Sequence, residues 1–200
     1  IFDRNNFPLA VSIVNYDLYA LKGFKKSDLL KLAENIELEF KLIDESYQKK
    51  TLLKKNVSKK EINLIKKLSL SNFEIEIRHS RHYPLGDQIG TLVGFYGKDG
   101  AQEGLEKSYD SLLAGEVGKK QYFKNAKQEV FVQPIEIKKA VKGKDIQLTI
   151  DATLQFYAYK YLVEGIKNNK AKAGTVVILD NEKGEVLAIA SYPSYNPNNP

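Results

Sequence analysis

The last fifty residues constrain the fold most, because a helix pattern is followed there by two apolar strands. A helix is predicted at 152–168, and strands at 174–180 and 185–191 meet across a turn at 181–184. Both strands are almost entirely apolar, so both of their faces should be covered. One helix covers only one face, and so short a segment cannot build that core alone. We therefore predict that residues 151–200 open a larger sheet domain whose remainder is missing.

The first part of the chain is predicted to mix short strands with helices. A strand is expected from Pro8 to Tyr19, followed by three helical stretches. Ser27 would cap the first helix, the second would run over about 44–55, and Ser58 and Glu61 would form a capping box at the third. The apolar stripe of the first helix would consist of Leu29, Leu30, Leu32, Ala33, Ile36 and Phe40, and that of the third of Ile62, Ile65 and Leu68.

From Phe73 onwards the hydrophobic period changes from that of a helix to that of a strand. Phe73, Ile75 and Ile77 alternate with charged residues, which is typical of a half-buried strand. A turn is expected at 83–86, a helix at 103–114 that ends at Gly115, and strands at 128–137 and 145–150 around a turn near Gly143.

The composition limits the class of protein. Hydrophobic residues make up 42% of the chain, which favours a folded protein, and no run approaches the roughly 20 apolar residues that cross a bilayer. Cysteine is absent, which excludes disulfides but fits either redox compartment. Methionine is absent too, and the chain starts directly in Ile1-Phe2, so we expect that a natural beginning, and with it a membrane anchor, has been removed.

The net charge of +6 comes largely from paired lysines between residues 49 and 67. Such pairs are typical of a solvated helical face, and the alternative is a surface that binds nucleic acid, anionic lipid or another anionic polymer. Aromatic residues do not alternate with these lysines as base stacking would require. No nucleic-acid partner is therefore predicted.

Five short motifs, in order along the chain, resemble those of class B penicillin-binding proteins. They are Asp3-Arg4 with Leu9-Ala10; Arg81-His82-Tyr83-Pro84-Leu85-Gly86; Gly104-Leu105-Glu106-Lys107-Ser108-Tyr109-Asp110 with Leu113 and Gly115; Leu148-Thr149-Ile150-Asp151 with Leu154-Gln155; and Ser191-Tyr192-Pro193-Ser194-Tyr195-Asn196-Pro197-Asn198. Each motif alone is weak, but their common order is a strong signal. The forms Gly94-Phe95 and Asn196-Pro197-Asn198 resemble the cell-division (septal) branch more than the elongation branch.

The resemblance implies an α+β fold in two parts. Residues 1–147 would form an elongated non-catalytic pedestal, a dimerisation-type domain of short strands and helices with a helical insert at about 27–68. Residues 148–200 would begin the α/β sandwich of a serine transpeptidase domain. Structural or interaction roles are implied for Asp3, Arg4, Arg81, Tyr83, Pro84, Gly86, Gly104, Glu106, Lys107, Asp110 and Gly115.

The resemblance also implies a function for the intact protein. It would be a D-Ala-D-Ala transpeptidase that cross-links peptidoglycan stem peptides at the septum and is acylated by β-lactams. Anchored on the periplasmic side of the inner membrane, it would dock membrane-bound division proteins and a glycan polymerase. A stand-alone periplasmic interaction module without catalysis is the alternative.

The catalytic motifs of this family, Ser-x-x-Lys, Ser-x-Asn and Lys-Ser/Thr-Gly, have no convincing counterpart in the chain. Ser46 starts a Ser-x-x-Lys pattern in a lysine-rich stretch of the pedestal, and Ser194 starts a Ser-x-Asn pattern ahead of its expected place. No Lys-Ser/Thr-Gly occurs at all. We therefore expect no catalytic residue in these 200 residues, and no activity from them alone.

Glu106 and Asp110 lie one turn apart on the predicted helix, so they should share a face and need a cation. Arg81 or Arg4 is the predicted partner, because a guanidinium pairs with carboxylates in a bidentate way that an ammonium cannot. The alternative is that these charges are exposed and contribute under about 1 kcal/mol.

Cofactor and metal sites are not predicted. His79 and His82 are spaced as metal ligands could be, but no cysteine or carboxylate cluster completes a site, so they are interpreted as turn residues. The Gly-Lys pairs at residues 97, 118 and 143 lack the preceding glycine of a phosphate-binding loop.

Overall fold

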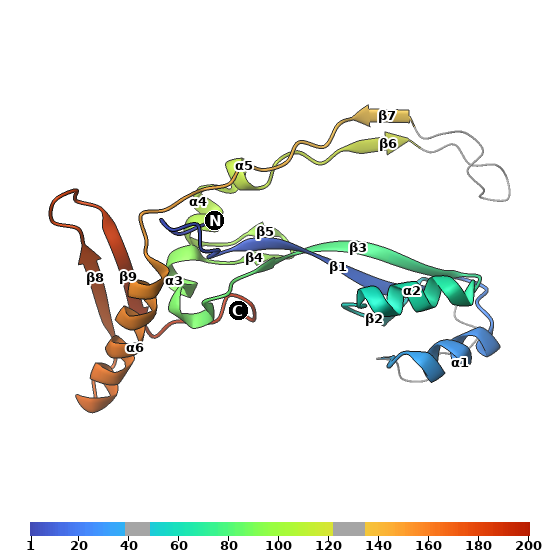
Figure 1. Cartoon of the computed structure of the whole chain (residues 1–200), viewed down its shortest axis with the longest axis horizontal. Helices are drawn as coiled ribbons and strands as arrows, with labels where there is room; N and C mark the ends of the chain where they lie inside the picture. Colours follow the sequence, from blue (N-terminus) through green and yellow to red (C-terminus); the bar gives the residue numbers. More distant parts are fainter. Residues whose placement is uncertain (39–48, 122–134) are drawn as a thin grey trace. The chain divides into compact units, whose positions relative to one another are not determined.

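The computed structural model describes residues 1–38, 49–121 and 135–200 (Figure 1). It contains both helices and strands, as an α+β fold requires. The chain divides into two compact units, of which one is Ser12–Ser80 and the other combines Ile1–Val11 with Arg81–Pro200.

The Ser12–Ser80 unit is built on a three-stranded sheet with the order β2-β1-β3. Strand β1 (Val11–Ala20) pairs antiparallel with β2 (Thr51–Lys54), with Leu18 opposite Lys54. Strand β3 (Phe73–His82) follows the predicted alternation only at its start: Phe73 and Ile75 pack on the core, but Ile77, which was expected on the same buried face, is 62% exposed. Strand β1 begins later than Pro8, because the N–H groups of Leu9 and Ala10 both donate to the carbonyl of Ile1.

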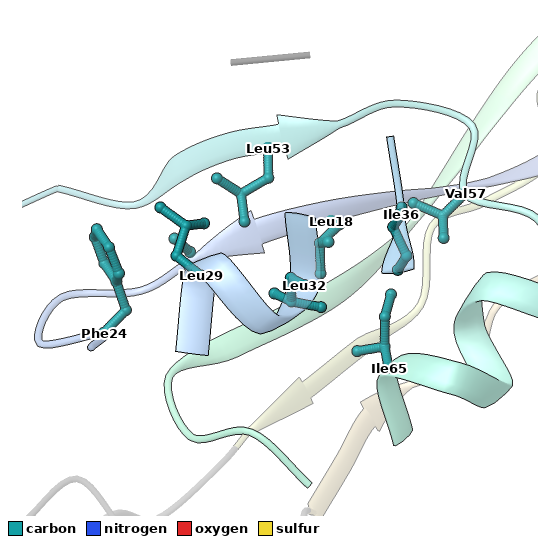
Figure 2. Packing of buried hydrophobic residues seen from close by; sticks show 9 residues of the cluster. Leu18, Phe24, Leu29, Leu32, Ile36, Leu53, Val57 and Ile65 are labelled. Carbon is teal, nitrogen blue, oxygen red and sulfur yellow. The ribbon is translucent and has the colours of Figure 1, made fainter. Parts of the chain in front are cut away.

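Two helices contribute to the core of this unit, α1 (Lys26–Asn35) and α2 (Lys59–Leu68). Figure 2 shows Leu29 and Leu32 of α1 close to Leu18, Leu53 and Ile65. Leu29 and Leu32 lie three residues apart and so share one face of the helix. Burial of these apolar side chains is the main force that holds the unit together.

Helix α2 begins as predicted. The hydroxyl of Ser58 accepts the N–H of Glu61, and the carboxylate of Glu61 accepts the N–H of Ser58. Ile65 is buried, and Ile62 and Leu68 pack on the core beside it.

Several local predictions for this unit are wrong. Helix α1 begins after Lys25, whose side chain forms no cap, so Ser27 lies inside the helix. The apolar stripe of α1 is narrower than expected, because Leu30 is 56% exposed and Ala33 is also exposed. Of the predicted stretch 44–55, residues Thr51–Lys54 form a strand, so the insert at 27–68 is not wholly helical. Phe40 and residues 44–48 lie outside the described residues.

After Arg81, the other unit continues with short elements. They are the 3-10 helix η1 (Gly86–Gln88), α3 (Gly90–Val93), the antiparallel pair β4 (Tyr96–Gly97) and β5 (Gly100–Ala101), α4 (Gly104–Ser108), α5 (Asp110–Leu113), and the antiparallel pair β6 (Lys119–Gln121) and β7 (Ile135–Lys138). The predicted turn at 83–86 is present, with Gly86 N–H donating to the carbonyl of Tyr83.

Two predictions for these elements need correction. The helix expected at 103–114 is two short helices, because the backbone leaves helical geometry at Tyr109 (φ −116°, ψ 18°). No strand forms at 145–150. The backbone of these residues bonds to Phe2 and Arg4, but the chain turns back after Arg4, so a single bridge forms, between Phe2 and Gln147. Of the strand predicted at 128–137, residues 135–137 lie in β7, and 128–134 lie outside the described residues.

The last fifty residues form the predicted helix and hairpin. Helix α6 (Ala152–Asn168) packs against β8 (Gly174–Leu179) and β9 (Val186–Tyr192), which pair antiparallel (Figure 1). Ala158, Ala188 and Ala190 form the small core between helix and hairpin. On the other face of β8, Val177 is 51% and Leu179 is 59% exposed.

A second core in this unit joins segments that are far apart in the sequence. Its buried members are Ile1, Leu9, Ala10, Tyr83, Ile89, Val93, Ile150 and Ala152. The start of the chain, the turn after β3 and the entry to α6 therefore share one apolar cluster, which positions the polar groups described next.

Candidate functional site

The carboxylate of Asp3 connects the start of the chain to helix α6. It is 1% exposed, and its Oδ1 accepts the N–H groups of Asn5 and Phe7, both at 2.7 Å. Its Oδ2 accepts the N–H of Ala152, the first residue of α6, at 3.0 Å. A negative charge is favourable there, because the N-terminus of a helix carries unpaired N–H groups and a positive partial charge. Asp3 therefore helps to fix where α6 begins.

Asp151 completes the N-terminus of α6. Its Oδ1 accepts the N–H groups of Thr153 and Leu154 at 2.9 and 3.0 Å. Two carboxylates from distant parts of the sequence thus satisfy neighbouring N–H groups of one helix.

Arg81 is the cation that pairs with Glu106. The Nε of Arg81 donates to Oε1 of Glu106 at 2.7 Å, and only 13% and 2% of the two side chains are exposed. The predicted pairing of Glu106 with an arginine is confirmed. The exposed-charge alternative is wrong for this pair, because burial removes the screening of water.

The other charged motif residues are arranged differently from the prediction. Arg4 pairs with Glu185 at 3.2 Å, and about a third of each side chain is exposed. Asp110 begins α5, whereas Glu106 lies in α4, and among the described residues Asp110 forms no ion pair and its buried Oδ1 has no hydrogen-bond partner. Lys107 is exposed.

Tyr83 is buried in the turn after β3. Its side chain is 2% exposed, and its hydroxyl oxygen accepts the N–H of Tyr96 at 2.8 Å. Burial first, and then the negative charge of Glu106, raise the pKa of Tyr83 above its ordinary value, so the phenol stays neutral. Pro84 beside it is exposed, and Gly86 adopts φ +51°.

Two motif glycines, Gly104 and Gly115, allow close approach of backbone segments. Both adopt a left-handed φ, +62° and +66°. A Cβ on Gly104 would lie 2.5 Å from the nitrogen of Gly94, and one on Gly115 would lie 2.3 Å from the carbonyl oxygen of Val141. Any other residue would be strained at these positions and would push the facing backbone away.

Gln155 and Asn198 hold the site together, although the sequence predicted no role for either. Gln155 is fully buried: its Nε2 donates to the carbonyls of Gln88 and Ile189 at 2.6 and 2.8 Å, and its Oε1 accepts the N–H of Ile189 at 2.9 Å. Asn198 bonds the backbone of Tyr83. Gln155 could have been noticed in the sequence, because it is an uncharged polar residue among the apolar residues of a predicted helix.

We call Asp3, Tyr83, Gln155 and Asn198, with their hydrogen-bond partners, the polar junction. These side chains bond mainly to backbone groups, which fixes segments in place and leaves no obvious chemistry to perform. The arrangement can hold the start of the chain and the turn after β3 against α6 and β9.

The remaining candidate residues do not extend this site. The hydroxyl of Ser194 donates to the carbonyl of Asp87 at 2.6 Å, whereas Ser46 lies outside the described residues. His79 and His82 lie in strand β3, so their interpretation as turn residues is wrong. Within residues 1–38, 49–121 and 135–200, no group of three or more metal-ligating side chains could hold an ion.

In the part of the chain that the structure describes, no helix combines the length and apolar character needed to cross a bilayer.

Comparisons with known proteins agree with the motifs. The model of the family described as "Penicillin-binding Protein dimerisation domain" matches residues 1–148. The "Probable peptidoglycan D,D-transpeptidase PenA" of Neisseria gonorrhoeae is 34% identical over 213 residues, covering 100% of this chain and 36% of the relative. The "Peptidoglycan D,D-transpeptidase FtsI" of Escherichia coli (strain K12) is 32% identical with the same coverage. The chain thus spans about a third of the length of these relatives.

Solved structures share the fold. A structure described as "Structural coordination of polymerization and crosslinking by a peptidoglycan synthase complex" has a TM-score of 0.77 at 26% identity, and covers 98% of this chain and 38% of that chain. Penicillin Binding Protein 2X from Streptococcus thermophilus has a TM-score of 0.74 at 24% identity, with 98% and 34% coverage. Since the family model matches most of its length, this chain belongs to the penicillin-binding proteins, through their dimerisation domain family.

Proposed function

We propose that the chain is the front part of a peptidoglycan D,D-transpeptidase that cross-links the cell wall at the division septum. The intact protein would join peptidoglycan stem peptides and be acylated by β-lactams at a serine outside these 200 residues. Residues 1–147 would be the non-catalytic pedestal, and residues 148–200 the first helix and strands of the catalytic α/β sandwich. The family match and the names of the relatives support this proposal.

The observation that carries the proposal is the bond from Asp3 to the first residue of α6. Its carboxylate accepts the N–H of Ala152 at 3.0 Å from a position 149 residues earlier in the chain. A catalytic domain whose first helix is held by the pedestal would have a defined position relative to it. The pedestal would thus position the domain that reacts, without taking part in the reaction.

Partner docking is the second role that we propose for the pedestal. Strand β7 of the β6–β7 ribbon exposes Ile135 and Ile137, each by 54%, and next to the ribbon Val141 is exposed by 54% and Val117 by 87%. A two-stranded ribbon alone is only marginally stable in water, so a covering partner would stabilise it. Membrane-bound division proteins and a glycan polymerase, on the periplasmic side of the inner membrane, are the proposed partners. The solved synthase complex of similar fold supports a polymerase partner.

The exposed ribbon also favours the alternative function, an interaction module without catalysis. Fluorescent penicillin separates the two. The 200-residue chain should stay unlabelled, whereas a longer protein that continues through the catalytic domain should be labelled covalently and compete with unlabelled β-lactam. Labelling of the 200-residue chain would show that the reactive serine has been misplaced. A folded longer protein that resists labelling would favour the interaction module.

A further inference from the structure

Residues 193–198, which directly follow strand β9, are held along their length by residues 83–103. The hydroxyl of Ser194 donates to the carbonyl of Asp87 at 2.6 Å. The hydroxyl of Tyr195 donates to the carboxylate of Glu103, and the ring of Phe95 meets the Tyr195 ring edge-on with centroids 6.0 Å apart. We call residues 193–198 the exit segment, because they carry the chain out of the hairpin.

Asn198 forms the final attachment of the exit segment. Its Oδ1 accepts the N–H of Tyr83 at 3.0 Å, and its Nδ2 donates to the carbonyl of Tyr83 at 2.9 Å. One amide thereby pairs with both backbone groups of a single residue, as a neighbouring strand would. Because the Tyr83 side chain is buried in the core, the backbone to which Asn198 bonds is itself fixed.

Gly90 lets the exit segment approach this closely. A Cβ on Gly90 would lie 2.1 Å from the carbonyl oxygen of Tyr195 and 3.2 Å from the hydroxyl of Ser194. Gly90 does not adopt a left-handed φ, so an alanine would suit its backbone but would collide with the exit segment. Glycine at this position therefore allows the close contact with the exit segment, and is not required by a turn.

The strand before the exit segment is attached to the same part of the chain. Gln155 bonds both backbone groups of Ile189 in β9 and also the carbonyl of Gln88. Attachments through Gln88, Asp87, Glu103 and Tyr83 thus leave β9 and the exit segment little freedom to shift against residues 83–103.

We propose that Asn198 is a positioning residue for the transpeptidase reaction. By tying the exit segment to Tyr83, it sets where the following part of the catalytic domain begins, and so acts on the reactive serine through the backbone. This inference rests on the proposed function. Displacement of a reacting group by about 1 Å can slow a reaction up to a hundredfold, so loss of this attachment should be visible in the rate.

The test uses the longer protein, which includes the catalytic domain, and measures its acylation by fluorescent penicillin. Asn198→Ala should lower the acylation rate at saturating penicillin by about tenfold, because the serine is less well placed. Its melting temperature should fall by less than about 4 °C, since the side chain lies at the surface. Asn199→Ala is the matched control: this neighbouring asparagine makes no side-chain hydrogen bond to any described residue, and its replacement should change neither quantity.

A second pair of variants displaces the exit segment without touching Asn198. Gly90→Ala should also reduce the saturating rate, whereas Gly165→Ala, whose added Cβ meets nothing within 4 Å, should not. A wild-type rate for folded Asn198→Ala would overturn the inference, and so would a lower melting temperature with an unchanged rate. Absence of labelling in the wild-type longer protein would instead overturn the proposed function, and this inference with it.

Discussion

A carboxylate that is removed from water needs a cation held in a fixed place, and Arg81 supplies it for Glu106. The contact uses Nε of the guanidinium, at 2.7 Å, with 2% of the Glu106 side chain exposed. A lysine would keep the charge but cannot reproduce this planar geometry. We predict that Arg81→Lys lowers the free energy of unfolding by about 1.5–3 kcal/mol, as measured by urea denaturation.

Arg4→Lys is the matched control for that prediction. The Arg4–Glu185 pair has the same chemistry, but about a third of each side chain is exposed. Its replacement should cost less than about 1 kcal/mol. Equal costs for the two variants would mean that burial does not strengthen the Arg81–Glu106 pair.

Glu61 makes the stability of the Ser12–Ser80 unit dependent on acid pH. The ammonium of Lys54 first, and then Ser58, lower the pKa of Glu61 from 4.5 to about 2. Because the folded pKa is the lower one, the stabilisation is complete above about pH 4.5 and is lost as the pH falls towards 2. Glu61→Gln should therefore flatten the fall in unfolding free energy between these pH values. Glu34→Gln, which removes an exposed carboxylate on α1, is the matched control variant for this measurement.

At the scale of elements, helix α2 has a capped N-terminus and a C-terminus whose backbone conformation is strained. Ser58 caps its N-terminus, whereas Ser69 closes its C-terminus in a left-handed conformation with φ +45°. Ser58→Ala should lower the unfolding free energy by about 1 kcal/mol. Ser69→Gly should raise it by up to about 1 kcal/mol, because glycine adopts that conformation without strain. Thermal and urea unfolding check both signs, and a stabilising Ser58→Ala would contradict this account of the helix.

The elements that the sequence predicted well are those with strong local signals. Helix α2 has a capping box, α6 a long apolar pattern, and β8 and β9 flank a turn. Strand β2 was missed because its residues Thr51–Lys54 carry no alternating pattern and are extended only through pairing with β1. The break at Tyr109 was missed as well, because neither glycine nor proline marks it in the sequence.

The same distinction explains which parts of the candidate site were predictable. The Arg81–Glu106 pair followed from charge, because a buried carboxylate must find a cation. The roles of Gln155 and Asn198 did not follow, since an amide can bond any backbone group. Asn198 reaches Tyr83 across 115 residues, and only the fold brings these two together.

At the scale of the whole molecule, α6 covers one face of the β8–β9 hairpin, and no other described helix covers the side chains of Val177 and Leu179 on the opposite face. Val177 and Leu179 remain more than half exposed on the other face. Both side chains are apolar, and strands that are apolar on both faces are typical of sheets covered on both sides. Under the proposed function, the catalytic domain that continues in the longer protein would supply this cover.

Leu179→Lys tests this consequence. In the 200-residue chain, where Leu179 is 59% exposed, the variant should change the unfolding free energy by no more than about 0.5 kcal/mol. In the longer protein the lysine would be buried without a partner, so the same variant should cost about 2 kcal/mol or more, measured as urea midpoints of the two proteins. Val117→Lys, at a position that is 87% exposed, is the control and should be neutral in both, because that position lies in the pedestal. If Leu179→Lys were equally harmless in both proteins, the outer face of the hairpin would be exposed to water in both. The rest of the catalytic domain would then not cover this face of the sheet.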